Sequence, residues 1–172
     1  MTYLAVAIAA VLLATLQVTV VPMFTISGAT ADLGLVAIIV ALVALGPRPA
    51  MVLTPLVALF TALSGNRAPG LLLIGYAAII PIGYVLDRYG MPPGHYPRIL
   101  ATAILSGLWI RLVLSLGAMA SGAELAVLEF LRSVLIPGVL IDAVLITLAY
   151  GALRLFGYGR MTFGLQRQGW LP

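Results

Sequence analysis

Two charged residues of this sequence lie inside long apolar runs. Arg111 lies in the middle of GLWIRLVLSLGAM (residues 107–119), and Asp142 lies in the last apolar run. At the depth of a bilayer, a charged side chain is costly unless it is paired or faces a water-filled cavity. The planar guanidinium of an arginine can present two parallel donors to a carboxylate. The first chemistry that these residue types suggest is therefore an ion pair inside a membrane.

The composition places the segments that carry these charges in lipid. Hydrophobic residues make up 63% of the chain and charged residues 8%, whereas soluble domains have about 45–50% and about 25%. We therefore predict one all-α, polytopic integral membrane domain over residues 1–172, with six transmembrane helices at about residues 3–21, 33–46, 51–63, 68–86, 99–120 and 134–156. The second and third segments are short for a crossing, so a re-entrant hairpin is an alternative to two full spans.

The arginines predict how these helices are oriented, because cytoplasmic loops collect basic residues. With the N-terminus inside, the outer loops hold only Arg67 and Arg132. The cytoplasmic side then holds six arginines, namely Arg48, Arg88, Arg98, Arg154, Arg160 and Arg167. We therefore predict that both termini are cytoplasmic. The net charge of +4 reflects this loop placement, and we expect no nucleic-acid partner.

Counting residues from the outer ends of two predicted helices gives the depth of the two buried charges. Arg111 lies about nine residues before the end of the fifth segment, and Asp142 lies about eight residues after the start of the sixth. At about 1.5 Å per residue the two levels nearly coincide. We therefore predict an intramembrane ion pair between them. It would either link two helices structurally, or form a polar spot that recognises a partner helix or gates a cavity.

Other polar residues have spacings typical of helix ends. Asp32 lies just before the second segment, where it can accept hydrogen bonds from the first turn as an N-cap. Ser121 and Glu124 have the spacing of a capping box. They predict the start of a short amphipathic helix on the outer surface, over residues 124–133, that leads into the sixth segment. That helix would be solvated or would dock an extracytoplasmic partner.

No set of residues indicates catalysis, a cofactor or a metal. Asp87, at the cytoplasmic end of the fourth segment, lies about 20 Å in depth from Asp142, too far for two carboxyl groups to share a proton. His95 is the only histidine and has no acids around it that would complete a metal site. The chain contains no cysteine. We therefore expect a protein that is not an enzyme.

Short motifs in the first half of the chain are similar to those of one membrane family. They are Leu12–Gln17, Val21-Pro22, Ala31-Asp-Leu-Gly-Leu35, Leu45-Gly-Pro-Arg48, and Ala62-Leu-Ser-Gly65 before Ala68-Pro-Gly70. Together they resemble the rod shape-determining MreD family over about residues 12–75. Ala31 replaces the proline usual in that family, and Thr61-Ala62 stands where an aspartate is common. The role of that missing acid is therefore not carried over.

The resemblance implies a non-enzymatic scaffold of the bacterial inner membrane that organises peptidoglycan synthesis and cell shape. Members bind the bitopic protein MreC and, through it, connect to MreB, RodA and a class B penicillin-binding protein. The family is also similar in fold to the substrate-binding S-components of energy-coupling-factor vitamin transporters. An S-component is therefore the alternative function, with a polar pocket that Arg111, Asp142, Asn66 and Asp32 would line.

Overall fold

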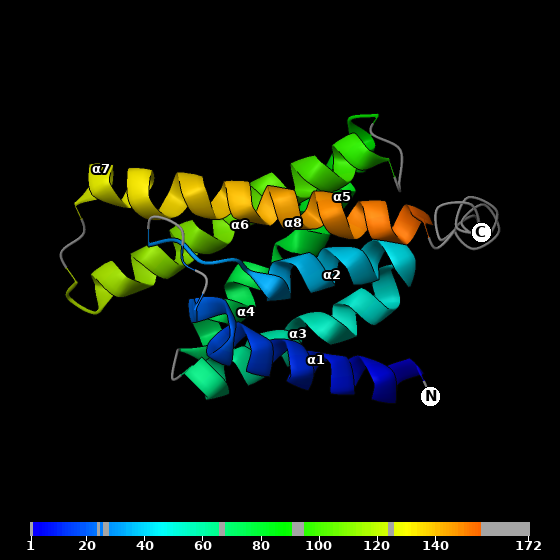
Figure 1. Cartoon of the computed structure of the whole chain (residues 1–172), viewed down its shortest axis with the longest axis horizontal. Coiled ribbons are helices and arrows are strands. Elements are labelled where there is room, and N and C mark those ends of the chain that lie inside the picture. The colour runs from blue at the N-terminus through cyan, green and yellow to red at the C-terminus, as the bar shows by residue number, and fades with distance from the viewer. Residues whose placement is uncertain are drawn as a thin grey trace.

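The structure of the protein is a computed structural model that describes residues 2–23, 25, 28–65, 68–90, 95–123 and 126–155. In these ranges the fold is all-α (Figure 1). The helices are α1 (Thr2–Thr19), α2 (Leu33–Ala44), α3 (Pro47–Gly65), α4 (Pro69–Ala77), α5 (Ile79–Arg88), α6 (Tyr96–Ala120), α7 (Val127–Phe130) and α8 (Ile136–Leu155). A 3-10 turn covers Val21–Met23, and a π-helical turn covers Leu131–Leu135.

Four helical stretches are long and apolar enough to cross a membrane, as expected of a multi-pass protein. They are Pro47–Gly65, Pro69–Arg88, Tyr96–Ala120 and Leu128–Leu155, with shorter apolar helices at Ala7–Met23 and Leu33–Ala44. Each of the six predicted segments therefore coincides with a helix. The third is longer than predicted, at 19 residues. The turn-like Pro47-Arg-Pro49 forms its first helical turn, where a missing N–H costs nothing.

The short α2 lies in the centre of the bundle, in contact with α1, α3, α5, α6 and α8. It consists only of glycine and aliphatic residues and has no polar face. Such a helix is stable where it is surrounded by protein. Leu35, Ile38 and Ile39 are accordingly buried almost completely. At 12 residues it is about 18 Å long, which is short of a hydrocarbon core of about 30 Å.

Close packing of α1 against α3 depends on small side chains. Ala10 and Ala14 of α1 are buried, as are Ala58 and Ala62 of α3. In lipid, helices gain little from burying apolar surface and associate through close van der Waals contact. Alanine at four-residue spacing lets the two backbones approach. The buried interior thus continues from α2 through α3 to α1.

The end of α6 corrects the prediction for Ser121. Ser121 is the C-cap of α6, and its hydroxyl donates to the carbonyl of Ala118 at 2.7 Å. Gly122 follows with a φ of 92°, and the amide of Ala123 donates to the carbonyl of Ala118 at 3.0 Å. This is a Schellman ending, which glycine favours because it lacks a Cβ. The serine therefore closes one helix and does not begin the next, which starts at Val127. Glu124 lies outside the described residues.

The described part of the predicted surface helix leads into the sixth segment, as expected, and it does so without a break. From Val127 to Leu155, helical structure continues without a break through α7, the π-helical turn and α8. Figure 1 shows α7 extending α8 at the same end of the bundle as the close of α6. The described part of the predicted helix is therefore an extension of α8. Apolar residues dominate on both sides of Glu129 and Arg132, and the helical pattern does not end there.

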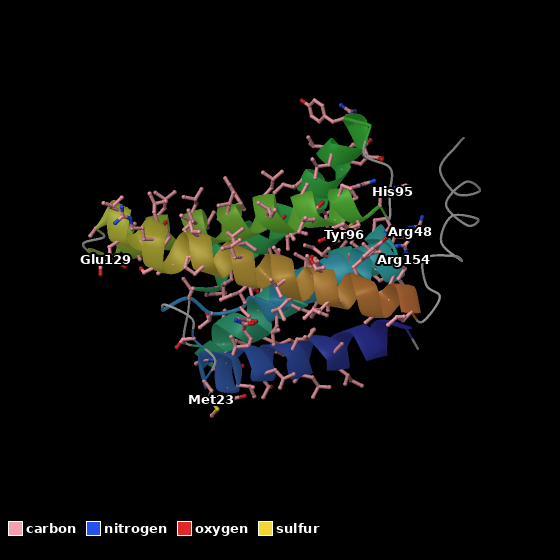
Figure 2. All side chains as sticks on the ribbon, turned by 45° about the horizontal axis from the view of Figure 1, so that its top comes forward. Met23, Arg48, His95, Tyr96, Glu129 and Arg154 are labelled. Atoms are coloured by element: carbon pink, nitrogen blue, oxygen red, sulfur yellow. The ribbon has the colours of Figure 1, made fainter. Side chains whose placement is uncertain are left out.

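Polar and charged side chains lie at both ends of the bundle. The start of α1, the α2–α3 turn and the end of α8 lie at one end in Figure 1. Arg48, Arg154 and His95 lie at this end in Figure 2, whereas Glu129 lies at the opposite end. Arg67, Arg160 and Arg167 fall outside the part of the chain that the structure describes.

Candidate functional site

The structure brings Arg111 and Asp142 together. Nη1 of Arg111 lies 2.6 Å from Oδ2 of Asp142. Arg111 is 9% exposed, and Asp142 is fully buried. The two residues lie on α6 and α8, which run side by side in Figure 1. A buried charge of either sign needs its partner, because water is not there to solvate it.

Two glycines make room for the guanidinium. A Cβ at Gly138, one turn before Asp142 on α8, would lie 2.6 Å from Nη2 and 2.7 Å from Cζ of Arg111. A Cβ at Gly107, one turn before Arg111 on α6, would lie 3.3 Å from Nη1 of Arg111 and 3.4 Å from Oδ2 of Asp142. Arginine is a wide side chain for a helix interface. Glycine on both helices lets it lie flat between them.

The loop before α2 supplies further partners to the ion pair. The backbone amide of Asp32 donates to Oδ1 of Asp142 at 2.8 Å, so both oxygens of the buried carboxylate accept a hydrogen bond. Nη2 of Arg111 donates to the carbonyl of Thr30 at 3.3 Å, and Nη1 donates to the carbonyl of Gly107 at 3.3 Å. The pair therefore ties the start of α2 to α6 and α8.

Asp32 is the N-cap of α2. Its Oδ1 accepts hydrogen bonds from the amide of Leu35 at 2.9 Å and from the hydroxyl of Tyr76 at 2.8 Å. Tyr76 comes from α4 and is 2% exposed. Its hydroxyl reaches Asp32 past Gly34, where a Cβ would lie 2.7 Å from that hydroxyl. The cap therefore also links α4 to the start of α2.

Gln17 holds the same loop from the other side. Its Nε2 donates to the carbonyl of Ala31 at 2.9 Å, and its Oε1 accepts from the amide of Leu33 at 2.7 Å. One side chain of α1 thus pairs with the loop on both sides of Asp32. Arg111, Asp142, Asp32, Gln17 and Tyr76 form one polar network, called here the buried network, that connects α1, α2, α4, α6 and α8.

The sequence indicated three members of the buried network, namely Arg111, Asp142 and Asp32. It did not indicate that Gln17 and Tyr76 meet them at the same loop. Gln17 entered only as part of a family motif, although an amide within an apolar helix is itself a signal for a buried hydrogen bond. Tyr76 gave no distinct signal, because tyrosine is also common at the ends of membrane helices. Of the other predicted residues, Ser121 lies at the end of α6, away from the network.

Protein groups occupy the charged side chains of the buried network. The carboxylate of Asp142 is occupied by Arg111 and by a backbone amide. The carboxylate oxygen Oδ1 of Asp32 is occupied by a backbone amide and a hydroxyl. Within the described residues, no group of three or more histidine and acidic side chains could hold a metal ion. Comparison of the chain with models of protein families, with curated proteins and with solved structures finds no match.

Proposed function

We propose that the chain is a non-enzymatic scaffold subunit of the bacterial cell-elongation complex, which binds MreC in the inner membrane. One observation carries the proposal. Gln17 and Asp32, which belong to two of the motifs that resemble the MreD family, meet at one loop in the buried network. These two motif residues are 15 positions apart in the sequence but meet at the loop before α2, so we infer that they share a structural role. That role is to hold the first two helices against the rest of the bundle.

A rigid bundle suits a scaffold, because a partner helix needs a surface whose shape does not change. The buried network joins five helices through hydrogen bonds in a region with little water. In such surroundings, breaking one bond leaves an unsatisfied group, which costs more than the bond itself contributes. The exposed apolar side chains of α6 and α8 are then fixed relative to one another. Through this scaffold, MreB, RodA and a class B penicillin-binding protein would be connected indirectly.

The orientation that we propose has both termini in the cytoplasm and six transmembrane helices. It follows from the arginine distribution and from the common end at which α1 begins and α8 finishes (Figure 1). Because the chain has no cysteine, single cysteines report on sidedness directly. In intact cells, a membrane-impermeant maleimide is expected to label Ser121→Cys and to leave Arg88→Cys unlabelled. The reverse pattern would invert the topology.

The partners can be tested by affinity capture of the tagged, full-length protein from native membranes in mild detergent. Mass spectrometry is expected to recover MreC, together with RodA and its penicillin-binding partner. Recovery of two ATPases with a membrane coupling subunit would instead support the S-component alternative and overturn the scaffold. An S-component would need Arg111 and Asp32 to contact a ligand, whereas here they bind protein groups.

A further inference from the structure

One of the long apolar stretches is interrupted in its middle. Pro69–Arg88 is long enough to cross a membrane, but it consists of α4 and α5, which meet at Ala78. The amide of Ala78 donates to the carbonyl of Tyr76, two residues back. It therefore does not donate to the carbonyl of Ile74, as it would in a regular α-helix. Since Ala78 lies halfway along these 20 residues, the released carbonyl lies at the depth of the hydrocarbon core.

Pro81, three residues after Ala78, favours the interruption. Proline has no N–H group to donate to the carbonyl four residues back, here that of Ala77, and its ring pushes that carbonyl aside. A proline alone does not interrupt a helix of this protein, because α3 contains Pro55 and is continuous from Pro47 to Gly65. The interruption at Ala78 therefore also depends on its surroundings.

Trp109 of α6 binds the released carbonyl. Its Nε1 donates to the carbonyl of Ile74 at 3.3 Å. Trp109 lies near the middle of α6, whereas tryptophan in membrane helices is most common at the interfaces. Within lipid, a carbonyl that its own helix has released needs a donor from a neighbouring helix. Trp109 supplies that donor and holds the interruption in one geometry.

α4 and α5 are held to the bundle unequally. α4 buries Leu72, Gly75 and Tyr76, and Tyr76 belongs to the buried network. α5 buries only Ile79 and Gly83, and its last turn projects away from the other helices in Figure 1. An element with few buried side chains opens locally at low cost. Movement about Ala78 would therefore displace α5 and leave α4 in place.

The far end of α5 is fastened by weak contacts. Arg98 of α6 donates to Asp87 at 2.9 Å and to the carbonyl of Gly83 at 2.8 Å. The side chain of Asp87 is 41% exposed, so water screens this pair. At Gly83, a Cβ would lie 3.5 Å from Cδ2 of Leu42 and 3.8 Å from Cγ2 of Thr102. Outward movement of α5 would therefore separate it from α2 and α6.

We propose that the interruption at Ala78 is a hinge and that Trp109 locks it. While Trp109 binds the carbonyl of Ile74, α5 lies against α2 and α6. When this bond breaks, α5 swings outward and uncovers the surface of α2 and α6 that Gly83 contacts. The buried network holds α1, α2, α4, α6 and α8 in place during this movement. The hinge does not depend on the proposed scaffold function.

Hydrogen exchange of the purified, full-length protein in detergent, followed by mass spectrometry, tests the lock. Trp109→Phe removes the N–H and keeps an apolar ring. It should speed exchange of the α5 amides about fivefold and leave the α8 amides within about twofold of the wild type. Pro81→Ala returns a donor to the carbonyl of Ala77, so α5 should exchange more slowly than in the wild type. Pro55→Ala is the matched control and should leave α5 unchanged.

The double variant Trp109→Phe with Pro81→Ala separates a lock from ordinary packing. If Trp109 acts by holding the interruption, its replacement should change α5 exchange by less than about twofold once the helix is continuous. A change of about fivefold in both backgrounds would overturn the proposal, as would unchanged α5 exchange in Trp109→Phe. Equal acceleration in α5 and α8 would also overturn it, because it would indicate lower stability of the whole bundle.

The direction of the movement can be measured with spin labels, because the chain has no cysteine. Val85 of α5, Leu73 of α4 and Leu148 of α8 are all exposed. In Trp109→Phe, the distance distribution between labels on Val85→Cys and Leu148→Cys should broaden toward longer distances. The distribution between labels on Leu73→Cys and Leu148→Cys should stay the same. An unchanged distribution for the first pair, or equal broadening of both, would contradict a swing of α5 about Ala78.

Discussion

Two ion pairs among the described residues have the same chemistry in different surroundings, and their comparison shows what a buried charge can do. Arg111 and Asp142 lie 2.6 Å apart, with side chains that are 10% and 1% exposed. Arg98 and Asp87 lie 2.9 Å apart, with side chains that are 15% and 41% exposed. Water screens the second pair, so its contribution to stability is small. In the first pair, water cannot replace either side chain as the partner of the other, because both are buried.

The two pairs also differ in what they connect. Arg98 links its own helix to α5, through Asp87 and the carbonyl of Gly83 at 2.8 Å. The buried pair instead binds the loop before α2 and is continuous with the hydrogen bonds of Asp32. The peripheral pair therefore fastens two neighbouring helices. The buried pair fixes the centre of the fold, and its loss should spread through several helices.

The largest expected effect is the loss of Arg111. Arg111→Ala leaves the fully buried carboxylate of Asp142 without its charged partner and opens the space that the guanidinium filled. We expect a loss of about 3–5 kcal/mol in the free energy of unfolding. Denaturant titration in mixed micelles, followed by circular dichroism, measures this loss. A loss below about 1 kcal/mol, the size typical of an exposed pair, would remove the distinction between the two pairs.

A methyl group at Gly138 should also disturb the buried pair. Gly138→Ala places a Cβ 2.6 Å from Nη2 of Arg111, so the guanidinium or α8 must move. Overpacking of this kind costs about 1–3 kcal/mol. Gly151→Ala on the same helix is the control, because a Cβ there meets nothing within 4 Å. Thermal unfolding in detergent should separate the two variants, and equal midpoints would mean that the interface tolerates the extra atom.

Removing one hydroxyl should give a smaller effect. Tyr76→Phe deletes the hydrogen bond to Oδ1 of Asp32 and preserves the ring. Since Asp32 keeps its bond from the amide of Leu35, we expect a loss of about 1 kcal/mol. Hydrogen exchange of the α2 amides should increase with it. Unchanged exchange in α2 would show that Tyr76 does not help to fix the start of that helix.

The smallest effect should come from the peripheral pair. Asp87→Asn removes the carboxylate charge opposite Arg98, which keeps its bond to the carbonyl of Gly83. We expect a loss of less than about 1 kcal/mol, and the difference from the wild type should shrink as salt is raised. Unfolding at low and high ionic strength measures both quantities. A large loss that salt does not change would place this pair in the same class as the buried one.

The sequence predicted how deep the buried charges lie along their helices better than it predicted which way each helix faces. Residue counts along two apolar segments matched Arg111 with Asp142, because the rise of a helix is constant. They did not show that Gln17 and Tyr76 face the same loop, because the rotation of each helix depends on packing. The length of α3 was missed for a local reason, since Pro47 and Pro49 favour turns and first helical turns equally. The sequence predicted a helix around Glu129 and Arg132 that leads into the sixth segment, but not that the two form one continuous helix.

The central claim is that Arg111 and Asp142 stabilise the protein as a unit, and a double-mutant cycle tests it most directly. The free energy of unfolding would be measured for the wild type, Arg111→Ala, Asp142→Ala and the double variant. We expect the double variant to be more stable than Arg111→Ala alone, because it buries no lone charge, with a coupling energy of about 2 kcal/mol or more. Losses that add to within about 0.5 kcal/mol would contradict the claim.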